Sequence, residues 1–240
     1  MKTMKRALTS IGLVFAIVCA ANCARAQVGT PPEEQKYFRV PHKYQVYFEL
    51  AGALPSSPGV FNDFWNSAFQ FGGGVGYTLF PWLDLKGNFA YASWDNNSTD
   101  SKAKIEYVGV EDVEGGLITT MTFSGSARFV AVPNARTNPF AEVSIGYFMT
   151  SADPITIEGI MEGTEANTME DASGMLISPA IGLQYALADS WSAYAKYSYV
   201  YCSSSVFAPG DLLLPVGEEE RVAGENQIFQ TIGVGIMLRF

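Results

Sequence analysis

The sequence has no apolar run long enough to cross a membrane as a helix. The longest run, at 11–21, has eleven residues, whereas a membrane-spanning helix needs about 20. Helical membrane proteins are therefore excluded. Yet 48% of the 240 residues are hydrophobic and 13% are aromatic, so the apolar residues are scattered along the chain.

Charged residues are also scarce. They make up 16% of the chain, against about a quarter of a typical soluble domain. The 24 acids outnumber the 15 bases and give a formal net charge of −9. Proteins that bind nucleic acid need a basic face, and this composition argues against one.

Cysteine and histidine are nearly absent. Cys19 and Cys23 lie in an N-terminal segment that we expect to be removed, which leaves Cys202 without a partner for an internal disulfide. One cysteine and one histidine, His42, cannot build a zinc site. We therefore expect no bound metal and no cofactor.

Residues 1–26 have the layout of a secretory signal peptide. Three bases within residues 2–6 precede an apolar stretch at 8–21, and Ala-Arg-Ala at 24–26 is a small-x-small cleavage site. The alternatives are a membrane anchor, for which the stretch is short, and lipidation at Cys23, whose preceding residues make a poor lipobox. Cleavage removes four bases and no acids, leaving 24 acids, 11 bases and a net charge of −13.

Residues 27–42 form a polar leader, which we expect on the periplasmic side, and residues 43–240 carry the fold. Eight segments in this part alternate large apolar residues with small or polar ones, a period of two that is typical of β-strands. The segments are 43–53, 68–79, 82–94, 117–131, 140–149, 176–187, 191–201 and 227–240.

The connections between these segments alternate strictly in length. The long, polar ones are 54–67, 95–116, 150–175 and 202–226, and only a few residues separate the other pairs. In an up-and-down antiparallel sheet, this alternation places all long loops at one end and all tight turns at the other.

The two faces of the predicted strands differ in residue size. One face is uniformly large and apolar, whereas the other is built from Gly, Ser, Ala and Thr with single charges. Small residues suit the narrow lumen of an eight-stranded barrel, and the large face then meets lipid, where the sheet must close. We predict an all-β fold: an eight-stranded antiparallel up-and-down transmembrane β-barrel. A secreted soluble β-sandwich is the alternative.

Aromatic residues near the ends of the segments predict two girdles at the membrane surfaces. The turn-side girdle has Phe80, Trp82, Phe140, Trp191 and Phe240, and the loop-side girdle has Trp94, Tyr147, Phe148 and Tyr201.

The last segment ends in Gly235, Ile236, Leu238 and Phe240, a glycine with alternating apolar residues and a terminal aromatic. This resembles the C-terminal assembly signal of bacterial outer-membrane barrels. By its pattern, 43–240 resembles the small outer-membrane β-barrel superfamily of OmpA-type transmembrane domains, opacity-type surface antigens and OmpW-type proteins. The resemblance implies a place in the Gram-negative outer membrane and insertion by the barrel assembly machinery.

The inward faces carry three acids and three bases, so the lumen is formally neutral. These residues are Glu49, Asp84, Lys86, Arg128, Glu142 and Lys196. An unpaired charge is costly in a narrow, low-dielectric lumen, so we expect these groups to pair. We hypothesise that they form a plug that closes the barrel; pairing with no gating role is the alternative.

Catalysis is not expected. Those small outer-membrane barrels that are enzymes use a histidine beside a serine or carboxylate at the outer rim, because the pKa of histidine lies near neutrality. The single histidine here, His42, precedes the first segment on the turn side.

The long loops hold 18 of the 24 acids and only three bases. Representative acids of this predicted surface are Asp153, Glu158, Glu162, Glu218, Glu219 and Glu220. Three interpretations of this surface are open. It is simply solvated, it binds lipopolysaccharide through divalent cations, or it binds a basic partner.

These features favour a non-enzymatic, monomeric barrel with a structural or surface-interaction role at the cell surface. The alternative is a small porin-like channel or an OmpW-type conduit for hydrophobic ligands. The apolar stretches 105–110 and 206–216 in the predicted loops favour this alternative. The neutral lumen and the lack of an apolar inner lining favour the first.

Overall fold

The computed structural model describes residues 43–57, 61, 65–95, 112–133, 135–153, 155–158, 165–166, 171–206 and 226–240. No helix within these residues is long and apolar enough to cross a membrane. The predicted signal peptide and the predicted leader lie outside the described residues, and both stay predictions.

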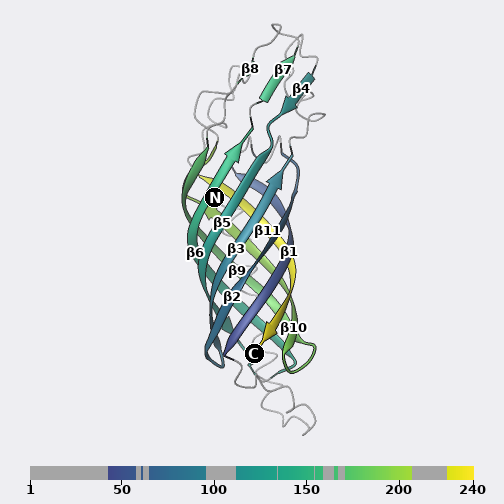
Figure 1. The fold of residues 1–240 in the computed structure, drawn as a ribbon, viewed down its shortest axis with the longest axis vertical. Helices are drawn as coiled ribbons and strands as arrows, with labels where there is room; N and C mark the ends of the chain where they lie inside the picture. The colour runs from purple at the N-terminus through teal and green to yellow at the C-terminus, as the bar shows by residue number, and fades with distance from the viewer. Residues whose placement is uncertain are drawn as a thin grey trace, which may run out of the picture.

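Eight strands close into a barrel in the order β1-β11-β10-β9-β6-β5-β3-β2 (Figure 1). They are β1 (Tyr44–Ser57), β2 (Ala68–Phe80), β3 (Leu83–Trp94), β5 (Ile118–Val130), β6 (Thr137–Ala152), β9 (Ala172–Ala186), β10 (Trp191–Cys202) and β11 (Gln227–Arg239). Every neighbouring pair is antiparallel. The predicted fold class is confirmed.

The first and last strands form the seam that closes the barrel. Tyr44 and Phe240 exchange two backbone hydrogen bonds, each 3.0 Å long, and β1 pairs with β11 from Gln45 to Ser57. Closure leaves no open sheet edge whose backbone groups would lie unpaired in hydrocarbon.

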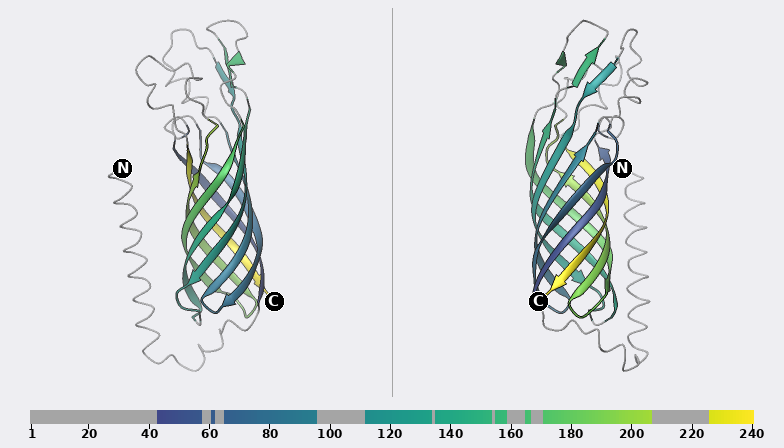
Figure 2. Two further views of the ribbon diagram at one scale, coloured as in Figure 1. Left: turned by 90° about the vertical axis from the view of Figure 1, so that its left-hand side faces the viewer. Right: turned by 45° about the vertical axis from the view of Figure 1, so that its right-hand side comes forward.

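The strand ends that lead into the long connections and those that meet at the tight turns lie at opposite ends of the barrel (Figure 2). Beyond the long-loop end, β4 (Asp112–Gly115), β7 (Ile155–Glu158) and β8 (Glu165–Ala166) form a separate three-stranded sheet. The sequence pattern did not predict this sheet, because four-residue and two-residue strands are too short to show a period of two. The barrel strands β1, β6 and β9 also extend three or four residues farther toward the loops than predicted.

Large apolar side chains face outward over the whole length of the barrel. Phe69, Val75 and Ile232 each expose more than 60% of their surface, which would be unfavourable in water for so many residues at once. Along β1, exposed and buried residues alternate strictly from Tyr44 to Leu54. The predicted assignment of the two faces is confirmed in this strand.

The prediction of the aromatic girdles was wrong for three residues. Trp94, Phe140 and Phe148 are fully buried inside the barrel, whereas the other six members of the predicted girdles are exposed. The reason is strand parity: Phe140 and Phe148 lie an even number of residues from Glu142, so they share its inward face.

Two lumen glycines make room for aromatic rings on neighbouring strands. A Cβ atom at Gly182 would collide with the ring of Phe140, and one at Gly235 would collide with the ring of Tyr194. The lumen is therefore filled by large side chains set against glycines, and not by small side chains alone.

Candidate functional site

Strand register places three of the predicted lumen charges in one row. Asp84 on β3 is directly opposite Arg128 on β5, which is directly opposite Glu142 on β6. All three are buried. Opposite charges at directly paired positions of adjacent strands attract one another, so the register favours pairing of these charges.

Glu142 is the centre of the network. Its Oε2 atom accepts a hydrogen bond from Arg128 Nε at 2.6 Å and one from Lys86 Nζ at 3.1 Å. Its Oε1 atom lies 3.8 Å from Lys196 Nζ. One carboxylate therefore balances charge from three different strands.

Lys196 extends the network to β1. Its Nζ atom lies 2.8 Å from Glu49 Oε2, which also accepts a hydrogen bond from the Tyr194 hydroxyl at 3.0 Å. The sixth predicted residue, Asp84, accepts a hydrogen bond from the Thr78 hydroxyl at 2.8 Å. Ion pairs thus join Glu49, Lys86, Arg128, Glu142 and Lys196, and the strand register places Asp84 opposite Arg128.

Aromatic rings pack against the cations of this network. The Arg128 guanidinium lies 4.0 Å from the ring centre of Phe140 and 4.9 Å from that of Tyr194. Lys86 Nζ lies 3.9 Å from the ring centre of Tyr47. These distances are typical of cation–π contacts. We call the six charged residues and these three rings the ionic layer.

Sequence reasoning did not include the three rings in the site. The signal was present, because Tyr47 and Tyr194 lie two residues from Glu49 and Lys196, and so share the inward face. The hydroxyl of Tyr47 also bonds to the Asn88 side chain and, at 3.2 Å, to the Gly87 carbonyl oxygen. These bonds fix the Tyr47 ring against β3.

A polar cavity of about 70 Å³ lies on the outer side of the ionic layer. Glu49, Glu142 and Lys196 line it together with a group of hydroxyl-bearing residues. These are Thr122, Ser124, Ser144, Ser178, Ser198 and Thr231. A polar cavity of this size has room for several water molecules.

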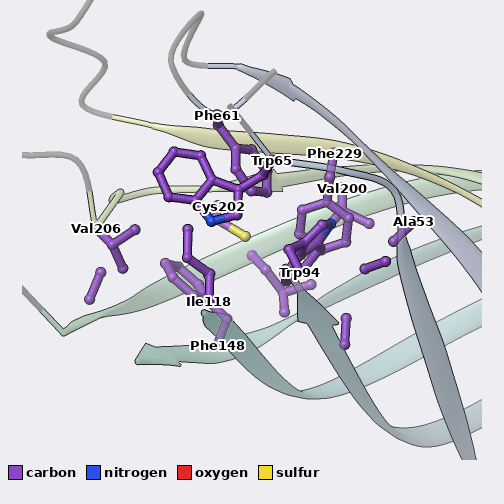
Figure 3. Close-up of a cluster of buried hydrophobic side chains, with 14 residues drawn as sticks. Ala53, Phe61, Trp65, Trp94, Ile118, Phe148, Val200, Cys202, Val206 and Phe229 are labelled. Atoms are coloured by element: carbon purple, nitrogen blue, oxygen red, sulfur yellow. The ribbon is translucent and has the colours of Figure 1, made fainter. Parts of the chain in front are cut away.

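An apolar cluster fills the outer mouth of the barrel, beyond the polar cavity (Figure 3). Every barrel strand contributes at least one residue, and further residues come from two connections. Its members are Ala53, Phe61, Trp65, Ala68, Ala92, Trp94, Ile118, Phe148, Ala172, Leu176, Val200, Cys202, Val206 and Phe229. We call this cluster the apolar cap.

The apolar cap corrects the prediction that the lumen has no apolar lining. Aromatic contacts hold its centre together: the ring centre of Trp94 lies 5.4 Å from that of Phe61 and 5.2 Å from that of Phe229. Leu176, Val200 and Phe229 also line the polar cavity. The cap therefore separates this cavity from the loop end.

The predicted acidic surface is described only in part. Asp153 is exposed and Glu158 ends β7, whereas Glu162, Glu218, Glu219 and Glu220 lie outside the described residues. His42 lies outside them as well. Within the residues that the structure describes, no group of three or more His, Cys, Asp or Glu side chains could hold a metal ion.

The predicted assembly residues lie at the closing seam. Ile236 and Phe240 are exposed on the outer surface, and Leu238 is half-buried on the same face. Gly235 faces the lumen, opposite Glu49.

The comparisons with known proteins agree with this architecture. A family model described as "Outer membrane protein beta-barrel domain" matches residues 13–240. No match was found among curated proteins.

Solved barrels are similar in fold. Neisserial surface protein A is 15% identical, with a TM-score of 0.52, and the match covers 82% of this chain and 97% of that one. Weaker matches are OprG from Pseudomonas aeruginosa (12% identity, TM-score 0.49, 85% and 99% covered) and the attachment invasion locus protein Ail of Yersinia pestis (12%, 0.47, 84% and 100%). At 15% identity, the likeness to Neisserial surface protein A shows the fold alone.

Proposed function

The chain belongs to the outer membrane protein beta-barrel domain family, and on that premise we propose that it is a non-enzymatic surface barrel with a lumen closed to ions and solutes. It lies in the bacterial outer membrane, as the family indicates. The observation that carries the proposal is the filling of the lumen at two levels, by the ionic layer and by the apolar cap.

Ions would meet a different obstacle at each level. In the ionic layer, Arg128, Lys86 and Lys196 already have carboxylate partners at 2.6, 3.1 and 2.8 Å, so a passing ion must compete with bonds formed in a poorly solvated site. In the apolar cap, an ion would have to lose its water among aromatic and aliphatic side chains, and hydrophobic constrictions exclude water and ions together.

The same arrangement supports a non-enzymatic role. Among the described residues, the carboxylates of the lumen bond to cations and to hydroxyl groups of the barrel itself. All three of these carboxylates, Glu49, Asp84 and Glu142, are buried in the lumen. A catalytic carboxylate would need access to a substrate.

We further propose partners for the outer surfaces. The acidic loops bind lipopolysaccharide through divalent cations, the exposed terminal face at Ile236 and Phe240 is bound by the barrel assembly machinery during insertion, and the barrel is a monomer. The net charge of −15 on the predicted loops supports the first of these.

Two assays test the role. In liposome swelling, the purified barrel should admit no small sugars, whereas a porin in the same lipid should. In whole-cell adhesion, cells that produce the native barrel should bind surfaces or host cells better than cells whose barrel has shortened long loops. Sugar uptake by the native barrel, or adhesion that is independent of the loops, would overturn the proposal.

A second function is favoured by one observation, the apolar lining of the outer mouth. That lining is the kind of surface that binds an apolar ligand, so a conduit for small hydrophobic molecules is the alternative candidate. Quenching of tryptophan fluorescence by such a molecule, lost in Trp94→Ala but kept in Trp191→Ala on the outer surface, would support this alternative.

A further inference from the structure

Two aromatic side chains of the apolar cap come from outside the barrel strands. Phe61 and Trp65 belong to the connection between β1 and β2, and both are buried, with 0% and 4% of their surface exposed. Their ring centres lie 6.4 Å apart. Residues of a connection at the barrel end are usually solvated, so their burial needs a cause.

Hydrogen bonds fix the position of Trp65 at the mouth of the barrel. Its indole Nε1 donates to the carbonyl oxygen of Gly116 at 2.6 Å, a buried bond. The next residue, Asn66, donates its backbone N–H to the carbonyl oxygen of Asp95 at 3.2 Å. Gly116 precedes β5 and Asp95 follows β3, so Trp65 and Asn66 are bonded to the end of β3 and to the start of β5.

The acceptor has a special backbone conformation. Gly116 has a φ of 76°, the only positive φ among the described residues, in the left-handed region that glycine adopts at little cost. Glycine at this position lets the chain turn between β4 and β5.

Phe61 and Trp65 are the upper part of a continuous apolar stack. Phe61 contacts Trp94, Trp94 contacts Phe229, and Phe229 lines the polar cavity below. The two upper rings therefore join the connection between β1 and β2 to the side chains beneath.

We propose that Phe61 and Trp65 form an outer gate that closes the barrel by excluding water and works independently of the ionic layer. The bond from Trp65 to Gly116 is the latch of this gate. The inference rests on the proposed closed lumen. It adds that the lumen has two separate closures, and that the outer gate can open while the ionic layer stays closed. Hydrophobic gates of this kind open when water wets them.

The chain carries its own reporter for the state of this gate. Cys202 belongs to the apolar cap, is fully buried, and is the only cysteine in 27–240. A charged, membrane-impermeant thiol reagent reaches this sulfur only if the outer mouth opens, so its rate of labelling measures how often the gate is open.

The test labels Cys202 in intact cells that produce the full chain. The native barrel should react slowly, and Trp65→Phe, which keeps a ring but removes the donor, should react about tenfold faster, the effect expected for one lost hydrogen bond. Trp65→Ala should react faster still. Trp82→Ala, which alters an exposed tryptophan at the turn end, is the matched control and should react like the native barrel.

The outcomes separate the two proposals. Equal labelling of the native barrel and both Trp65 variants, with all of them folded by heat-modifiable migration in gels, would overturn the gate. A barrel that labels slowly but passes small sugars would overturn the closed lumen instead. In Trp65→Ala, sugars should still be excluded, because the ionic layer is intact; passage of sugars through this variant alone would show that the two closures are not independent.

Discussion

The two ends of the lumen are closed by different chemistry. At the turn end, the ionic layer joins charges from five strands at distances of 2.6 to 3.8 Å. At the loop end, the apolar cap joins aromatic and aliphatic side chains from all eight strands and two connections. Ion pairs between strand residues thus close the turn end of the lumen. At the loop end, the connections supply further side chains, and hydrophobic packing closes the lumen.

This difference in chemistry predicts how each closure responds to the substitution of its residues. Ion pairs in a buried site lose much when one partner is removed, because the remaining charges are left uncompensated. A packed apolar cluster loses in proportion to the cavity that is left. Substitutions at the two ends should therefore lower the free energy of unfolding by different amounts.

The largest effect is expected for Glu142→Gln. This change removes the acceptor charge shared by Arg128, Lys86 and Lys196, and loss of a buried partner costs about 3–5 kcal/mol. Urea unfolding in lipid vesicles measures the loss. Asp189→Asn, at an exposed turn position, is the control. A loss below about 1 kcal/mol, the size of a surface pair, would show that the ionic layer does not stabilise the barrel.

Removal of a cap side chain comes next. Trp94→Ala deletes a fully buried ring that packs on Phe61 and Phe229, and such truncations cost about 3 kcal/mol or more in protein cores. In the same unfolding assay, Trp191→Ala on the outer surface should cost less. An equal cost for both tryptophans would mean that lipid and the cap stabilise tryptophan alike.

A smaller effect separates inward from outward glycines. Gly182→Ala forces a methyl group against the ring of Phe140, whereas Gly87→Ala points into open space. Overpacking costs about 1–3 kcal/mol, so the first variant should unfold at lower urea and the second should match the native barrel. If Gly87→Ala destabilised the barrel more than Gly182→Ala, the packing of large lumen side chains against glycines would be refuted.

The smallest effect is expected at the outer loops. If the acidic loops bind divalent cations, a chelator should lower the melting temperature by a few degrees, equivalent to about 1 kcal/mol. The midpoint is read from heat-modifiable gel migration of the barrel in outer-membrane fragments. No shift on adding chelator would leave the acidic loops as a merely solvated surface.

Much of the ionic layer could be predicted from the sequence. A period of two fixes which face each residue occupies, so Glu49, Glu142 and Lys196 were placed inside the barrel. Pairing across strands then follows from adjacency and charge. The exact partners could not be predicted, because the register between strands depends on the connections.

The apolar cap was missed for two physical reasons. Trp94 and Phe148 were assigned to a lipid-facing girdle by their place near strand ends, although parity put them on the inward face. Phe61 and Trp65 belong to a connection without periodicity, so no sequence pattern shows that they fold back over the mouth. Residues of the second kind are found only from the structure.

The central claim is that the native barrel is closed, and recording from single barrels in planar lipid bilayers tests it most directly. With the full chain inserted in a symmetric salt solution, we predict no steady conductance. A large, steady conductance through the native barrel would contradict the account, because neither the ionic layer nor the apolar cap would then block the passage of ions.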